Sequence, residues 1–188
     1  MDNTFSAFDP DKSVFKYWRH LPHWEQLGAT YFVTFRTADS LPVEKLNDLR
    51  WQRDMWLKAH PRPWSSEELL EYSRSILARL DLWLDRGFGT CPLEDSGASK
   101  IVAEALHHFD GTRYFLDKYV VMPNHAHTLV MPIREHALDD ILFSWKSFTA
   151  NKVNSLLKRQ GQLWIHESFD RIMRTWEDVE NAREYILN

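Results

Sequence analysis

Hydrophobic residues alternate with polar ones, or cluster in short β-branched runs, in three segments that predict strands. The first, Ala29–Thr37, is rich in aromatic and β-branched residues and follows a glycine. Thr112–Met122 and His125–Pro132 have the same character, and Pro123 and Asn124 between them favour a turn. These last two segments are therefore predicted to form an antiparallel hairpin.

Hydrophobic residues spaced three and four apart predict helices in much of the remaining chain. The helices cover residues 43–60, 65–86, 100–109, 137–159 and 177–188. Ser65 or Ser66 can cap the second helix, and Gly87 ends it. The other segments are expected to be a polar tail before the first strand, an exposed loop over 87–99, and a loop or short strand over 161–176.

The composition is that of a globular protein in a reducing compartment. Of 188 residues, 44% are hydrophobic and 27% are charged, and this length suffices for one domain with its own core. Cys91 is the one cysteine, which excludes an internal disulfide and a cysteine-based zinc site. The opening residues lack a secretory signal, and no apolar run approaches the ~18 residues of a membrane span. We therefore expect a cytoplasmic protein with no membrane partner.

The net charge of −4 argues against a protein that coats nucleic acid by bulk charge, but a local basic surface is compatible with it. Between residues 143 and 176, basic residues exceed acidic ones, and aromatic residues are interleaved, among them Trp145, Trp164, Phe169 and Trp176. The basic residues are Lys146, Lys152, Lys158, Arg159, Arg171 and Arg174. Cations for phosphates and aromatic faces for bases suit single-stranded nucleic acid, although a solvated helix face can have the same composition.

Two histidines one residue apart are the first candidates for chemistry. Successive side chains of a strand point to opposite faces, so His125 and His127 share a face and Ala126 points away. Neutral imidazole is a common metal ligand, and one further oxygen or nitrogen ligand would complete an open site. Taken alone, such a pair more often lines a sheet face without binding anything.

Tyr185 on the last helix is a candidate nucleophile. With a reference pKa of ~10, a tyrosine hydroxyl is a weak nucleophile unless a cation or a base assists it, and a neighbouring metal would supply that help. The simpler interpretation is that the ring packs and the hydroxyl meets water, as in most tyrosines.

Several segments, in order along nearly the whole chain, resemble one family. YVVMPNHAHTLVMP, residues 119–132, resembles the signature of the HUH single-tyrosine transposases. The segments SWKSFTANKVNSLL, LWIHESFDRIMR and REYILN, together with the early YWRHLPHWEQLGATYFVTFRTADSLP, resemble the REP-associated tyrosine transposases, a branch linked to repetitive extragenic palindromes. This ordered series outweighs the simpler interpretation of the histidine pair.

The resemblance implies an α+β fold of ferredoxin-like type. An antiparallel sheet would present the two histidines on one face and pack helices on the other. The helices of residues 43–86 would be an elaboration after the first strand, within a single HUH transposase-like domain over residues 1–188.

The resemblance also implies a single-stranded DNA endonuclease and strand transferase that acts on hairpins of palindromic repeats. His125 and His127 would hold Mg²⁺ or Mn²⁺, and Tyr185 would attack the scissile phosphate to leave a 5′-phosphotyrosine and a free 3′-hydroxyl. The covalent link conserves the phosphodiester energy, so the strand can be rejoined without ATP. The residues expected to contact phosphates are Lys146, Lys152, Arg171 and Arg174. The protein could be a monomer or a homodimer.

The sequence departs from the family at its end. The family places a further polar ligand four residues after the tyrosine, which would be position 189, and the chain stops at Asn188. We expect either a copy truncated at its C-terminus or a partial substitution by Asn188.

Two other functions remain open. A non-cleaving protein that binds single-stranded DNA hairpins, as a domesticated regulator, would form no covalent adduct. A metal-dependent hydrolase that acts through water would need His125 and His127 but not Tyr185.

Overall fold

The computed structural model describes the chain except for residues 1–4, 19–21, 62–63, 73–74, 77 and 134. Its centre is a four-stranded antiparallel sheet with the strand order β4-β5-β3-β6. The elements that build this unit are β3 (Tyr31–Arg36), α4 (Ser96–His107), β4 (Tyr114–Met122), β5 (His125–Pro132), α5 (Leu138–Leu156) and β6 (Phe169–Ile172). This βαββαβ succession, with the first and third strands in the middle, is the ferredoxin-like arrangement, so the expected α+β fold is confirmed.

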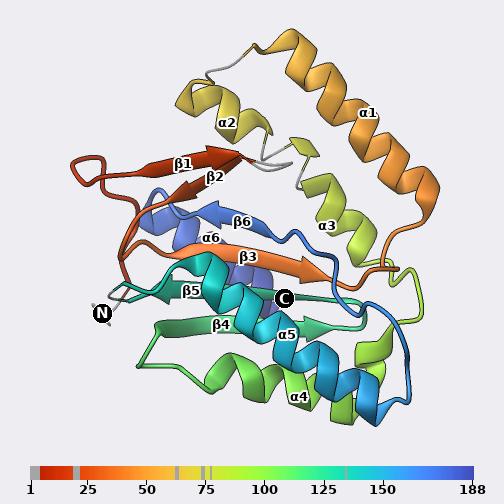
Figure 1. The fold of residues 1–188 in the computed structure, drawn as a ribbon. Coiled ribbons are helices and arrows are strands. Elements are labelled where there is room, and N and C mark those ends of the chain that lie inside the picture. The colour runs from red at the N-terminus through yellow and green to blue at the C-terminus, as the bar shows by residue number, and fades with distance from the viewer. Residues whose placement is uncertain (1–4, 19–21, 62–63, 73–74, 77, 134) are drawn as a thin grey trace.

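The two faces of the sheet are covered by different helices (Figure 1). Every second residue of β3, namely Tyr31, Val33 and Phe35, points to the face covered by α4 and α5, where the largest hydrophobic cluster lies. Phe32 points to the opposite face and packs, with Leu129 of β5, against α6 (Trp176–Leu187). The residues of α6 in this contact are Val179, Ala182 and Ile186.

The region between β3 and α4 is helical, as expected. It comprises α1 (Val43–Ala59), α2 (Ser66–Tyr72) and α3 (Ala78–Leu84), which lie beyond the β6 edge of the sheet in Figure 1. Ser65 caps α2, since its hydroxyl accepts a hydrogen bond from the Glu68 amide at 3.1 Å and its own amide donates to the Glu68 carboxylate at 2.7 Å. The prediction of one continuous helix over 65–86 falls partly on residues 73–74 and 77, outside the described chain.

Two local features differ from the prediction, and the expected loop or short strand over 161–176 proves to contain a strand. The expected polar tail contains a two-stranded hairpin, β1 (Phe15–Trp18) with β2 (Pro22–Glu25), which pairs within itself and not with the central sheet. Helix α4 begins four residues earlier than expected because the Asp95 carboxylate caps it, accepting a hydrogen bond from the Ala98 amide at 2.9 Å. The 161–176 segment supplies β6, a short edge strand paired with β3.

Candidate metal and nucleophile site

The two histidines lie on the interior strand β5, which pairs with β3 on one side and β4 on the other. His125 is 0% and His127 is 2% exposed, and both point to the face covered by α6. Ala126 points to the α4 and α5 face, where it joins the main core. The sequence prediction that the two imidazoles share one face is confirmed.

Asn124 determines which nitrogen of His125 carries the proton. The Asn124 side-chain amide donates to the Phe88 carbonyl oxygen at 2.8 Å, which orients its own carbonyl oxygen toward the His125 ring. That oxygen lies 2.8 Å from Nδ1 of His125 and can only accept a hydrogen bond, so Nδ1 carries the proton. Nε2 of His125 therefore presents a lone pair to the site.

Thr34 of β3 is the hydrogen-bond partner of the His127 ring. Its hydroxyl oxygen lies 2.8 Å from Nδ1 of His127 and can either donate to or accept from that nitrogen. The two Nε2 atoms of His125 and His127 are 2.9 Å apart. Either the Nε2 of His127 donates a hydrogen bond to His125, or Thr34 accepts from Nδ1 and both Nε2 lone pairs face a common cation.

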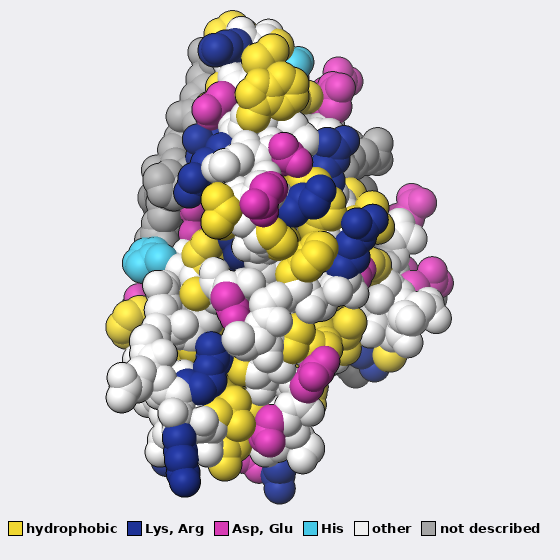
Figure 2. Space-filling model, turned by 90° about the vertical axis from the view of Figure 1, so that its right-hand side faces the viewer, with side chains coloured by type: hydrophobic (Ala, Val, Ile, Leu, Met, Phe, Trp, Pro, Cys, Tyr) yellow, Lys and Arg dark blue, Asp and Glu magenta, His cyan; other side chains and the backbone are white. Residues whose placement is uncertain are grey.

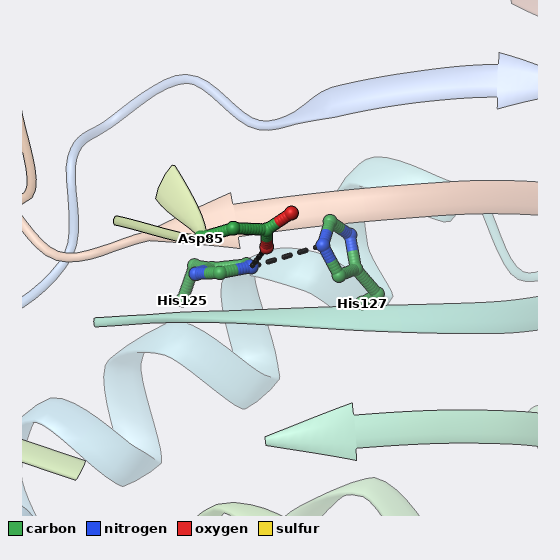
Figure 3. A group of neighbouring side chains, drawn as sticks. All are labelled: Asp85, His125 and His127. Carbon is green, nitrogen blue, oxygen red and sulfur yellow. Dashed lines mark hydrogen bonds and ion pairs between the residues drawn. The ribbon is translucent and has the colours of Figure 1, made fainter. Parts of the chain in front are cut away.

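A carboxylate completes a three-ligand group at this point. Oδ1 of Asp85 lies 3.7 Å from Nε2 of His125, and one ligand atom from each of Asp85, His125 and His127 falls within 4.8 Å of the others. Figure 3 shows the carboxylate of Asp85 reaching down to the two imidazoles that rise from β5. The side chain of Asp85 is 46% exposed, so the group is open to solvent on that side.

Burial keeps both imidazoles neutral. It lowers the pKa of His125 to about 4, and burial together with the neighbouring His125 lowers the pKa of His127 to about 3. Neutral imidazole is the form that binds metal, and two imidazole nitrogens with a carboxylate oxygen suit a divalent ion such as Mn²⁺. The residues present therefore fit the expected metal, and a possible divalent metal site is a feature of the structure.

Tyr185 lies beside this group. Its ring centroid is 5.4 Å from that of His127 and 5.9 Å from that of Phe32, and its side chain is 44% exposed. Partial burial raises the pKa of the Tyr185 hydroxyl, and the negative charges of Asp81 and Asp85 raise it further. A divalent ion held near those carboxylates would oppose the effect of their charge on the tyrosine.

Two contacts fix the helix that carries Tyr185. Thr175 and Asp178 form a capping box at the start of α6. The Arg183 guanidinium donates to the Asp117 carboxylate of β4 at 2.5 Å. This contact holds the C-terminal half of α6 against the sheet. The tyrosine and the histidines thus come together within one chain.

The four residues predicted to contact phosphates are not gathered on one surface. Arg171 of β6 lies near Tyr185, with its guanidinium carbon 5.8 Å from the Phe32 ring centroid. Lys146 of α5 donates to the His166 carbonyl oxygen at 2.6 Å and to the Ser168 hydroxyl at 3.1 Å. Lys152, also on α5, is exposed and lies 5.9 Å from the Phe148 ring centroid.

Arg174 is half-buried just before α6, and burial lowers the pKa of its guanidinium. On the face at the right of Figure 1, shown in Figure 2, dark blue basic and magenta acidic side chains are interspersed and form no single basic patch. The assignment of these four residues to DNA contacts stays a prediction.

Asp85 is the site residue that the sequence did not predict. It follows α3, in the region expected to be mere elaboration, and lies 40 positions before the first histidine, so no spacing rule connects the two. Asn188, proposed as a partial substitute for a missing ligand, instead donates its side-chain amide to the Glu184 carbonyl oxygen at 2.9 Å. Among the histidine, cysteine, aspartate and glutamate side chains of the described chain, Asp85 supplies the third ligand atom near the histidines.

No family model and no curated protein matches the chain. Among solved structures, the chain is similar to a REP-associated tyrosine transposase bound to a REP hairpin, at 12% identity and a TM-score of 0.41, over 92% of this chain and 70% of the other. In the described part of the chain, no helix is long and apolar enough to span a bilayer.

Proposed function

We propose that this protein is a metal-dependent single-stranded DNA endonuclease and strand transferase that acts on hairpins formed by palindromic repeats. The observation that carries the proposal is the meeting of a tyrosine with a three-ligand group. The Tyr185 ring centroid lies 5.4 Å from that of His127, whose Nε2 is 2.9 Å from that of His125. A purely structural pair of buried histidines would not call for the carboxylate of Asp85 beside it.

The residues have distinct roles in the proposed reaction. His125, His127 and Asp85 hold Mg²⁺ or Mn²⁺, which would stabilise the negative charge that develops on the phosphate. The Tyr185 oxygen attacks phosphorus, the bond from phosphorus to the 3′ oxygen breaks, and that oxygen takes up a proton to become a 3′-hydroxyl. The phenol proton passes to solvent. Attack by a 3′-hydroxyl on the resulting 5′-phosphotyrosine reverses these steps and joins the strands.

The test uses end-labelled single-stranded hairpins taken from repeats that flank the gene, incubated with the full chain and Mn²⁺. A protein–DNA band that resists denaturant is expected, and it should disappear with chelator and in Tyr185→Phe. Tyr119→Phe is the matched control, because Tyr119 lies on β4 and its hydroxyl is 3.2 Å from His107 rather than near the histidine pair. That variant should retain the band.

The other outcomes select other functions. Cleavage that persists in Tyr185→Phe would identify a hydrolase that uses activated water. Hairpin binding with no covalent band in the presence of Mn²⁺ or Mg²⁺ would identify a binding protein and contradict the proposed transferase.

A further inference from the structure

A cavity of about 530 Å³ opens beside Tyr185, between α3, β3, β6 and α6. Its volume lies within the range of about 300–1,000 Å³ that is typical of small-molecule sites. The apolar part of its lining includes Phe32, Leu80, Leu82 and Phe169. Because Tyr185 and Asp85 also line it, a ligand in this cavity would lie next to the candidate nucleophile and metal group.

The walls of the cavity combine aromatic side chains with a cation. The His127 ring stacks on Phe32, with centroids 5.2 Å apart and an interplanar angle of 23°. Arg171 stands over the Phe32 ring at 5.8 Å. Aromatic faces beside an arginine are what proteins use to stack an unpaired base and hold its phosphate.

Asp81 is the unusual member of the lining. Asp81 is half-buried, and within the described residues its carboxyl group makes no hydrogen bond and no ion pair. A half-buried carboxyl that lacks a donor loses part of its hydration without compensation, and the cavity that it lines is the side from which a ligand could supply that donor.

We propose that this cavity binds one unpaired base of the DNA substrate next to the scissile phosphate, and that Asp81 selects guanine. The inference rests on the proposed function, because it places the base beside Tyr185. The two carboxylate oxygens of Asp81 match the two adjacent donors, N1–H and N2–H, on the Watson–Crick edge of guanine. Adenine, cytosine and thymine each present an acceptor beside their donor on that edge, so a carboxylate meets a repulsive atom.

The test measures binding without cleavage, in EDTA, with fluorescein-labelled pentanucleotides of thymidine whose central position is G, A, C or T. By fluorescence anisotropy, the wild-type chain is expected to bind the G oligonucleotide about tenfold more tightly than the T oligonucleotide, as a bidentate base contact provides. Inosine at the centre lacks the N2 amino group, so it should lose a large part of this preference.

Asp81→Asn should reduce the preference for G over T to less than about threefold and should bind inosine and guanine equally, since an amide offers one acceptor and one donor. Asp48→Asn is the control, because it removes the same charge from an exposed position of α1 outside the cavity. That variant should keep the wild-type preference. Replacing guanine by inosine tests the same contact in the unmodified protein.

Equal binding of the four oligonucleotides, or a preference unchanged in Asp81→Asn, would overturn the inference. The covalent assay with Tyr185→Phe is separate from this measurement. A tyrosine-dependent adduct without any base preference would therefore refute the base pocket and leave the transferase standing. A guanine preference that depends on Asp81, in a protein that forms no adduct, would support the pocket and contradict the transferase.

Discussion

At the scale of single residues, each ring of the histidine pair has a neighbour that hydrogen-bonds to its Nδ1 atom. Asn124 fixes Nδ1–H of His125, while the Thr34 hydroxyl is the partner of Nδ1 of His127. Partners of this kind typically change metal affinity 10- to 100-fold when they are removed. Thr34→Val is therefore expected to weaken Mn²⁺ binding by about that factor, measured by isothermal titration calorimetry.

Thr128→Val is the matched control for this prediction. Thr128 is also a buried threonine of the central sheet, one residue after His127 and on the opposite face. Its hydroxyl oxygen has no hydrogen-bond partner among the described residues, so valine should leave stability equal or higher and Mn²⁺ affinity unchanged. Equal loss of affinity in both variants would show that the effect of Thr34→Val is not specific to the ring of His127.

Asp81 should make stability depend on pH in a direction that can be tested. The pKa of its carboxyl is about 7 in the folded protein against 3.8 as the reference value, so folding favours the protonated form. The stability that this group contributes is fully present below pH 3.8 and is lost as pH rises through about 7. Asp81→Asn should therefore be more stable than wild type at pH 8, with a gap that shrinks toward pH 5.

Urea unfolding at the two pH values, in EDTA, measures that gap. Asp48→Asn, which removes the same charge from an exposed position, is the control. A gap for Asp81→Asn that is the same at pH 5 and pH 8 would mean that the Asp81 carboxyl titrates near its reference pKa in the folded protein.

Hydrophobic periodicity and the family motifs were sufficient to predict part of the candidate site from the sequence. The two-residue period of a strand placed His125 and His127 on one face, and the family resemblance singled out Tyr185. Asp85 could not be found this way, because its approach to the histidines is set by how α3 packs on the β6 edge. Leu80 and Leu84 of α3 produce that packing, through a cluster that includes Phe169.

At the scale of elements, the sequence predicts the helices and strands that have a clear hydrophobic period, but it does not predict the short strands β1 and β2. The hairpin of β4 and β5 and the long helix α5 follow regular hydrophobic spacing, and their bounds lie within a few residues of the expected ones. The four-residue strands β1 and β2 are too short to show an alternation of their own. The start of α4 was misplaced because Asp95 was read as part of a loop rather than as a cap.

Helix α6 is held to the sheet by an ion pair that can be weakened without touching the site. Arg183 contacts two carboxylates, that of Asp117, whose side chain is 10% exposed, and that of Glu180, which is 58% exposed. Asp117→Asn should cost about 1–3 kcal/mol and reduce hydrogen-exchange protection over 176–187, since charged hydrogen bonds contribute most where water is excluded. Covalent adduct formation should fall, while Mn²⁺ affinity should be nearly unchanged because the histidines lie on β5.

Glu180→Gln removes the other partner of the same guanidinium and provides the control. Exposed ion pairs contribute about 0–1 kcal/mol, so this variant should resemble wild type in both assays. If Asp117→Asn and Glu180→Gln behave alike, the pair with Asp117 does not position the tyrosine.

At the scale of the whole molecule, Asp85 would link the helical insertion to the sheet through the metal. The insertion carries the carboxylate and β5 carries both imidazoles, so the site would exist in the folded chain and not in the unfolded one.

A ligand at a concentration 100 times its Kd stabilises the folded state by about 2.7 kcal/mol, which corresponds to an increase in Tm of roughly 5–10 °C for a chain of this length. We expect Mn²⁺ to raise the Tm of the EDTA-treated protein by this amount and to increase hydrogen-exchange protection over 78–84. Asp85→Ala should abolish the added protection of α3, whereas Asp48→Asn should preserve it; protection that rises equally in Asp85→Ala would show that the ion does not bridge the insertion and the sheet.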